Sequence, residues 1–151
     1  MDILHLGKYY PPYHGGVETA MAAICEGLAE AGEAVTALVA NDGPTAAQET
    51  RAGVAVTRMA RTRVWFSQPI CPALGPTLAA SRQDILHVHL PNPLAAWHCL
   101  RRRPPGRWLA LYHSDIVKQK GRSLETWPYP QLSTPASPCG HGLQSRIQAA
   151  I

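Results

Sequence analysis

The chain has 151 residues, of which 46% are hydrophobic and 16% are charged. This length and composition suffice for one hydrophobic core, which excludes two full domains and excludes disorder over most of the chain. The formal net charge of +4 is too small to indicate nucleic acid binding, but it is compatible with anionic ligands or a membrane surface.

The four cysteines are widely spaced, and no two of them have the spacing of a zinc or redox motif. They are Cys25, Cys71, Cys99 and Cys139. We interpret them as the reduced thiols of a cytosolic protein rather than as a disulfide scaffold. The N-terminus lacks a signal-peptide pattern, and the apolar runs are far shorter than the roughly 20 residues of a membrane span. These features predict a cytoplasmic protein.

A strand, a helix and a second strand are predicted at the start of the chain. Residues 2–7 (DILHLG) are typical of a short buried strand, and the Pro and Gly pairs in residues 8–16 break regular structure. Apolar residues recur at helical spacing over residues 17–31, and Gly32 ends this helix. Residues 34–40 (AVTALVA) predict a second buried strand. Because a crossover must join them, the two strands are expected to be parallel.

Three more strands and two short helices are predicted further along the chain. The strands are expected at residues 53–59, 84–90 and 107–112. The first of these alternates in hydrophobicity and is expected nearer a sheet edge. Three prolines make residues 60–76 irregular, and short helices are expected to end at residues 77–81 and to span residues 94–102. Strands that alternate with helices predict an α/β fold with a mostly parallel sheet.

The chain changes character after Gly121. Residues 122–151 contain four prolines, with Ser and Thr around them, and almost no helical or strand periodicity. We expect a folded domain at residues 1–121 and an irregular or disordered tail at residues 122–151. Two explanations of the tail stay open: a disordered segment, or a segment translated after the natural reading frame was lost.

Two glycines, Gly15 and Gly16, stand where the chain enters the first predicted helix. Glycines let a ligand approach the backbone closely, and free N–H groups at a helix start favour an anion such as phosphate. The pattern is neither GxGxxG nor a P-loop, which argues against a dinucleotide enzyme and an NTPase. The alternative is a tight turn without a ligand, in which Glu18 interacts with the helix dipole.

Two histidines share one face of the strand predicted at residues 84–90. His87 and His89 lie two residues apart, so their side chains point the same way. A metal pair is one interpretation, although the spacing places no third ligand. A hydrogen-bonded structural role is the alternative for His87, whereas His89 lies near the carboxyl end of the strand, where a ligand could reach it.

The run His113-Ser114-Asp115 follows the strand predicted at residues 107–112. Neighbouring residues do not converge as a nucleophilic triad requires, and the chain lacks a G-x-S-x-G elbow, so a hydrolase is not indicated. His113 is a candidate polar contact to a ligand, and Ser114 or Asp115 is a candidate turn cap.

Half of the fourteen basic residues lie in one stretch of the sequence. They are Arg101, Arg102, Arg103, Arg107, Lys118, Lys120 and Arg122. This group forms either a solvated surface or a surface attracted to anionic lipid head groups or a pyrophosphate-linked lipid. Interleaved aromatic residues and a known nucleic-acid-binding motif are missing from the sequence, so nucleic acid is not expected as a partner.

Three segments, in this order, resemble the retaining glycosyltransferases of family 4: residues 8–18 (KYYPPYHGGVE), 84–91 (DILHVHLP) and 112–119 (YHSDIVKQ). Members of that family have the GT-B fold, in which two Rossmann-like lobes face each other across a cleft. The resemblance covers residues 1–121 and implies a single Rossmann-like lobe, the N-terminal half of a GT-B fold. It further implies transfer of a sugar from a nucleoside-diphosphate sugar to a glycan or lipid-linked acceptor, with neither a metal nor another cofactor.

The resemblance also implies roles for single residues. Gly15 and Gly16 would lie against the diphosphate and the sugar of the donor, and His113, the candidate catalytic residue, would reach the transferred sugar or the reaction centre. Glu18 would hold the glycine loop. The candidates that line the cleft or contact the acceptor are His89, Lys8, Tyr9, Glu18 and Asp115.

Family members are more than twice as long as this chain, and their second lobe carries glutamates and a basic pair that hold the donor. Glu125 is the only late glutamate here. Because transfer requires fixed groups that stabilise the charge of the leaving diphosphate, we expect the chain alone to be inactive. It would be truncated or would pair with a separately encoded C-terminal lobe, and peripheral contact with the inner face of the membrane fits either case. The alternatives are a non-catalytic binding or interaction module that keeps the phosphate-binding loop, and a metal-dependent hydrolase built on the histidines.

Overall fold

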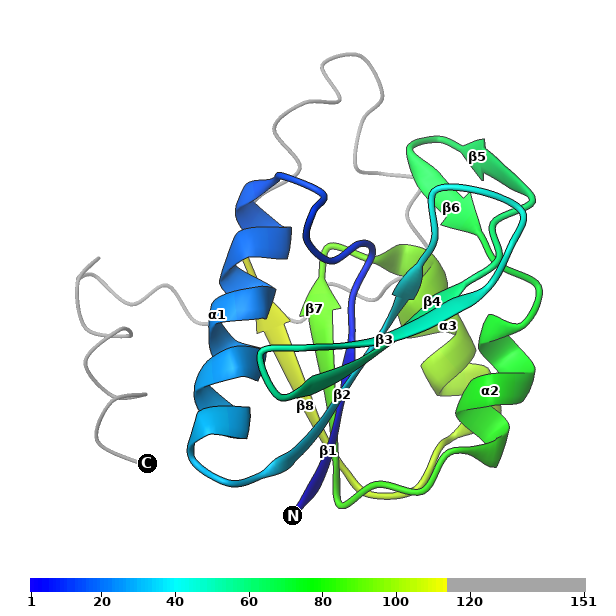
Figure 1. Cartoon of the computed structure of the whole chain (residues 1–151). Coiled ribbons are helices and arrows are strands. Elements are labelled where there is room, and N and C mark those ends of the chain that lie inside the picture. Colours follow the sequence, from blue (N-terminus) through cyan, green and yellow to red (C-terminus); the bar gives the residue numbers. More distant parts are fainter. Residues whose placement is uncertain (114–151) are drawn as a thin grey trace, which may run out of the picture. The chain divides into compact units, whose positions relative to one another are not determined.

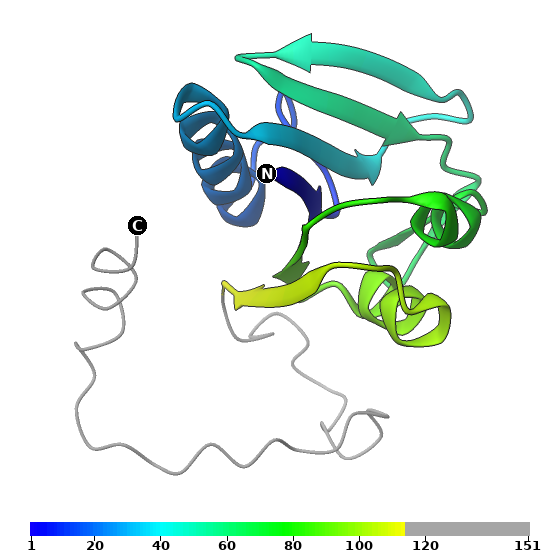
Figure 2. The same cartoon turned by 90° about the horizontal axis from the view of Figure 1, so that it is seen from below.

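The computed structural model describes residues 1–113. A six-stranded sheet has helix α1 on one face and helices α2 and α3 on the other (Figures 1 and 2). The helices are α1 (Gly16–Glu30), α2 (Leu74–Ala80) and α3 (Pro93–Arg102). The strands of this sheet are β1 (Asp2–Leu6), β2 (Ala34–Ala40), β3 (Ala47–Arg51), β4 (Val54–Met59), β7 (Ile85–Leu90) and β8 (Arg107–Tyr112). A separate two-stranded hairpin consists of β5 (Arg63–Trp65) and β6 (Gln68–Ile70).

The strand order in the sheet is β3-β4-β2-β1-β7-β8. All neighbours are parallel except β3, which pairs with β4 in the antiparallel sense at one edge. The chain builds outward from β1 through β2 and then returns to the other side of β1 with β7. The order therefore reverses between β1 and β7, and in such sheets ligands bind outside the carboxyl ends of the strands at this reversal.

The central strands bury apolar side chains on both faces, as strand β2 illustrates. Val35, Ala37 and Val39 belong to the apolar cluster beneath α1. Leu38 and Ala40 belong to the cluster that includes side chains of α2 and α3. A strand covered by helices on both sides needs apolar residues at consecutive positions. This requirement explains the continuous apolar run that made β2 visible in the sequence.

The predicted α/β fold with a mostly parallel sheet is confirmed. The bounds of β2 and β8 agree with the sequence prediction, and those of β1, α1, β4, β7 and α3 differ by at most one residue at either end. Strand β4 lies next to the edge strand, which agrees with its expected position near an edge. The predicted domain end after residue 121 and the predicted tail lie outside the described residues.

The prediction that residues 60–76 are irregular is wrong, and strand β3 was missed. All five residues of β3 are exposed, so its sequence carries no alternation, and only its pairing with β4 defines it as a strand. In the hairpin, Pro69 lies opposite Val64, and a two-stranded ribbon has edges at which proline is tolerated. Helix α2 also begins at Leu74, within the same stretch.

Asn92 and Pro93 start helix α3 directly after β7. The Asn92 side chain accepts a hydrogen bond from the backbone N–H of Ala95 at 3.3 Å, and Pro93 occupies the first turn, where its missing N–H costs nothing. The helix ends at Arg102 and is followed by the C-cap residue Arg103, which has a left-handed φ of 46°. Within residues 1–113, no helix combines the length and the apolar character needed to cross a membrane.

Candidate functional site

The loop between β1 and α1 lies at the carboxyl end of the sheet and is fastened to its neighbours. Tyr10 is fully buried, and the Arg58 side chain of β4 donates hydrogen bonds to the backbone carbonyls of Tyr10 and Pro11. The rings of Tyr9 and Tyr13 stack with their centroids 4.3 Å apart. A loop packed in this way holds the residues that follow it in a fixed position.

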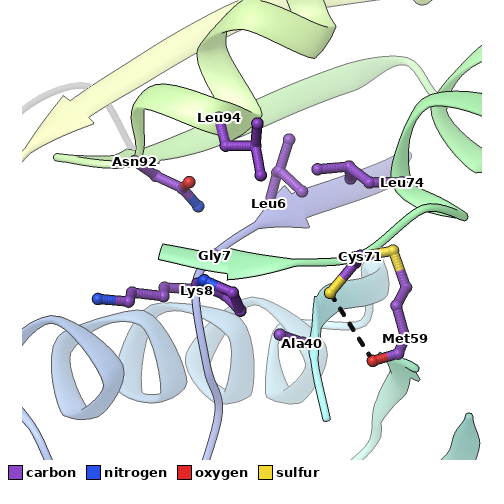
Figure 3. Close-up of a pocket in the computed structure, with 10 residues that line it drawn as sticks. Leu6, Gly7, Lys8, Ala40, Met59, Cys71, Leu74, Asn92 and Leu94 are labelled. Atoms are coloured by element: carbon purple, nitrogen blue, oxygen red, sulfur yellow. Dashed lines mark hydrogen bonds between the residues drawn. The ribbon is translucent and has the colours of Figure 1, made fainter. Parts of the chain in front are cut away.

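Lys8 and Tyr9, the two residues expected at the rim of a cleft, have different surroundings. The Tyr9 ring is buried and its hydroxyl accepts a hydrogen bond from Arg61 at 3.1 Å, so Tyr9 packs the loop. Lys8 is half-buried, and its side chain points away from Leu6 and Leu74 (Figure 3). Burial lowers the pKa of Lys8, and the charge of Glu18 opposes this change.

Helix α1 begins at the glycine pair without a side-chain cap. Gly15 is the N-cap in an extended conformation, and the first bonded amide of the helix is that of Thr19, which donates to the Gly15 carbonyl at 2.9 Å. The backbone N–H groups before Thr19 have no partner within the helix. A Cβ placed on Gly16 would meet no atom within 4 Å among residues 1–113, so the described part of the chain leaves the space beside this helix start open.

Glu18 connects the helix start with the other end of the candidate site. Its carboxylate folds back over Gly15, where a Cβ would lie only 2.1 Å from Glu18 Oε2. Burial lowers the pKa of His113, and the negative charge of Glu18 acts in the opposite direction. The charge of Glu18 thus acts both on Lys8 in the loop after β1 and on His113, which follows β8.

A chain of hydrogen-bonded histidines runs from the sheet to His113. In it, Nδ1 of His5 lies 2.9 Å from Nε2 of His89, and Nδ1 of His89 lies 2.8 Å from Nε2 of His113. His5 and His89 are at most 1% exposed, whereas His113 is half-buried. The strand register explains the arrangement, since His5 pairs with His87 and side chains two residues apart share a face.

The buried rings are neutral at pH 7. Burial lowers the pKa of His5 and of His89 to about 3, and that of His87 to about 4, because a charged imidazole loses its hydration inside the protein. Neighbouring imidazoles add to the effect in each case. The sequence identified His87 and His89 as one face of a strand but did not identify His5, because the pairing of β1 with β7 cannot be read from local spacing.

Three of the histidines, His5, His87 and His89, form a cluster of the residue type that binds metal ions. One ligand atom from each of His5, His87 and His89 lies within 4.8 Å of the others, and neutral imidazole is a good metal ligand. Two nitrogens on a tetrahedral zinc ion, with bonds of about 2.0–2.1 Å, are roughly 3.3 Å apart. Within this group, His5 Nδ1 and His89 Nε2 are closer than this, at 2.9 Å, which is a hydrogen-bond distance rather than the spacing of two ligands in a preformed zinc site.

A small pocket lies at the same end of the sheet, on the side of α2 and α3 (Figure 3). Its walls are mainly apolar and are formed by Leu6, Gly7, Lys8, Ala40, Met59, Pro69, Cys71, Leu74, Asn92 and Leu94. Gly15, Gly16 and His113 are not among these residues, whereas Lys8 is. Ser114 and Asp115 lie outside the described residues.

The sequence matches the model of Glycosyltransferase Family 4 over residues 14–138. The chain belongs to glycosyltransferase family 4. The matched range begins at the glycine loop and includes both later segments on which the resemblance rested. It also extends beyond residue 121, so the predicted end of the folded domain stays a prediction.

Two similar proteins are each much longer than this family 4 chain. The O-antigen chain mannosyltransferase C of Escherichia coli is 31% identical over 130 residues, which cover 80% of this chain and 33% of the relative. Sucrose-phosphate synthase from Thermosynechococcus elongatus has a similar structure, with a TM-score of 0.54 and 19% identity over 81% of this chain and 37% of that one. The fold is thus that of one lobe of a GT-B glycosyltransferase, and the chain spans about a third of the length of these relatives.

Proposed function

We propose that this family 4 chain is the N-terminal, acceptor-side lobe of a retaining glycosyltransferase. The complete enzyme moves a sugar from a nucleoside-diphosphate sugar to a glycan or lipid-linked acceptor. Family membership and the mannosyltransferase relative support glycosyl transfer. The observation that carries the proposal is the glycine pair at the open start of α1, which follows β1 at the carboxyl end of the parallel sheet.

The glycine pair is the proposed contact for the diphosphate of the donor. The open space at Gly16 lets a phosphate approach the backbone, and the first-turn N–H groups, which have no partner within the helix, lie at the positive end of the helix dipole. The Glu18 carboxylate covers Gly15 and is therefore assigned to holding the loop rather than to contacting the anionic donor. His113 is the proposed catalytic residue, and it contacts the transferred sugar from the end of β8.

A single lobe does not complete this chemistry. Stabilising the negative charge of a leaving diphosphate requires several fixed donors or cations around it, and one helix start supplies only part of them. The chain spans about a third of the length of its relatives. We therefore assign the remaining donor contacts to a second lobe and expect the chain alone to show no appreciable turnover.

Peripheral membrane contact in the cytoplasm is part of the proposal, and helix α3 supports it. Trp97 and Leu100 are 51% and 59% exposed, and Arg101 lies over the Trp97 ring with its guanidinium carbon 5.7 Å from the ring centroid. These positions have helical spacing and share a face, next to the exposed Arg102 and Arg103. Aromatic and basic side chains on one helix face suit the surface of an anionic membrane, where a lipid-linked acceptor would reside.

Amide NMR of the ¹⁵N-labelled chain tests the donor site. A nucleoside-diphosphate mannose is expected to shift the amide signals of Gly15, Gly16 and Val17 in a saturable manner. Gly16→Ala fills the open space and is expected to weaken this binding at least tenfold, about 1.4 kcal/mol. Gly27→Ala is the matched control, because Gly27 also lies in α1 with no atom within 4 Å of a Cβ. Equal binding by the Gly16→Ala variant would contradict the assignment.

A fusion to the C-terminal region of the Escherichia coli relative tests transfer itself. The fusion is expected to move labelled sugar onto a lipid-linked acceptor fraction, whereas the unfused chain leaves the acceptor unlabelled. His113→Ala in the fusion is expected to reduce the transfer rate by roughly 10²–10⁴-fold. Turnover by the unfused chain would refute the single-lobe account. Donor binding without transfer by the fusion would instead support a non-catalytic binding module.

A further inference from the structure

We propose that His5 and His89 are positioning residues that fix the tautomer of His113. The hydrogen-bond chain would hold the proton of the neutral His113 ring on Nδ1, which leaves Nε2 as an acceptor within the chain. His113 would then present an N–H donor, rather than a lone pair, to a ligand oxygen. The inference rests on the proposed function only in assigning that oxygen to the transferred sugar.

Because each neutral ring carries one proton, the hydrogen bonds that join His5, His89 and His113 have only two possible arrangements. A neutral imidazole carries one N–H and one lone pair, and both nitrogens of His89 are hydrogen-bonded, to His5 at 2.9 Å and to His113 at 2.8 Å. In the first arrangement His5 donates to His89, and His89 donates to His113. In the second arrangement every bond is reversed, so His113 donates to His89 and His89 donates to His5.

His5, at the buried end of the row of hydrogen-bonded histidines, distinguishes these arrangements. His5 Nε2 is buried and has no hydrogen-bond partner among the described residues, in a side chain that is 0% exposed. The first arrangement leaves a lone pair at this nitrogen, whereas the second leaves an N–H group. Buried N–H groups without a partner are rarer in proteins than acceptors that lack one, so the buried end favours the first arrangement.

In the first arrangement His113 carries its N–H on Nδ1, the ring nitrogen that is not bonded to His89. The buried end at His5 therefore selects the Nδ1–H form in all three rings, although a histidine in water prefers the Nε2–H form.

Heteronuclear NMR of the chain labelled with ¹⁵N-histidine tests the tautomer directly. Long-range ¹H–¹⁵N spectra at pH 7.5 are expected to give His113 a protonated-type shift at Nδ1 and an unprotonated-type shift at Nε2. The His113→Gln variant assigns the signals. Scalar coupling across the hydrogen bonds is expected to connect His5 with His89, and His89 with His113. An Nε2–H tautomer of His113 in the unsubstituted protein would overturn the proposal, whether or not any variant folds.

A matched pair of ring substitutions separates positioning from packing. His89→Phe keeps a buried ring but removes both nitrogens, and it is expected to shift His113 toward the Nε2–H form. His87→Phe makes the same change in a neighbouring ring whose centroid lies 4.5 Å from that of His89 and whose Nε2 has no partner among the described residues. It is expected to leave the His113 tautomer unchanged. If the His113 tautomer is unchanged in folded His89→Phe protein, the hydrogen bonds through His89 are not what fixes it, and the proposal is refuted.

Zinc titration of the unsubstituted chain adds a further test. A metal held by these rings would replace the hydrogen bonds, so stoichiometric loss of the cross-bond couplings on adding Zn²⁺ at micromolar concentration would overturn the proposal in favour of a metal site. Unchanged couplings support it. None of these spectra requires donor or acceptor, so failure of the transfer assay leaves the tautomer result intact, and the reverse also holds.

Discussion

Acid is expected to unfold this protein through the buried histidines of β1 and β7. In the folded state His5 and His89 have a pKa of about 3 and His87 has a pKa of about 4, against an ordinary value of 6.5 in the unfolded chain. Below pH 6.5 the unfolded chain binds more protons than the folded one. The stability contributed by the neutral rings is therefore complete above pH 6.5 and is lost as the pH falls toward 4 for His87 and toward 3 for His5 and His89.

The magnitude follows from proton linkage. At pH 5 each of the three rings lowers the free energy of unfolding by about 2 kcal/mol relative to pH 8, or about 6 kcal/mol together. Near pH 5 unfolding takes up about three protons, which corresponds to a slope of about 4 kcal/mol per pH unit. Since domains are typically stable by only about 5–15 kcal/mol, such a loss brings the protein close to unfolding at mildly acidic pH.

Urea unfolding followed by far-ultraviolet circular dichroism, repeated between pH 8 and pH 5, measures this dependence. His5→Phe removes one titrating ring and is expected to reduce the slope near pH 5 by about a third. Leu78→Ala is the control, because it removes a buried apolar side chain and no titrating ring, and it is expected to lower stability at every pH without changing the slope. A free energy of unfolding that stays constant from pH 7 to pH 5 would refute the argument that burial keeps these rings neutral.

Three further substitutions test the helix, the proposed membrane surface and the core. Gly27→Ala in the middle of α1 has open space for its Cβ and is expected to raise the free energy of unfolding by about 0.5–1 kcal/mol in urea titrations; a decrease would contradict the open surroundings. Trp97→Ser is expected to weaken sedimentation with phosphatidylglycerol vesicles roughly tenfold, about 1.4 kcal/mol, whereas Trp65→Ser, which replaces a more exposed tryptophan on the β5–β6 hairpin, is expected to change it little; equal effects would contradict a contact through α3. Leu86→Ala, at a fully buried position between the sheet and α2 and α3, is expected to lower stability by about 2–5 kcal/mol without changing the amide signals of Gly15 and Gly16.

The candidate site divides into residues that local pattern revealed and a residue that it did not. Gly15 and Gly16 could be identified because glycines before an amphipathic run mark the start of a helix after a strand. His113 could be identified because it follows an apolar run that predicts a strand. His5 was missed because it matters only through His89, which lies 84 residues away in the sequence.

The sequence by itself determined the three helices, the strands β1, β2, β4, β7 and β8 and the mostly parallel sheet, because burial imposes a local period on each amphipathic or apolar segment. Only the tertiary structure decided that β7 returns to the free side of β1 and that β3 forms the antiparallel edge. It also decided which histidines meet. Strand pairing depends on covering two sheet faces at once, and neither the neighbour nor the register of a strand is encoded in the periodicity of that strand alone.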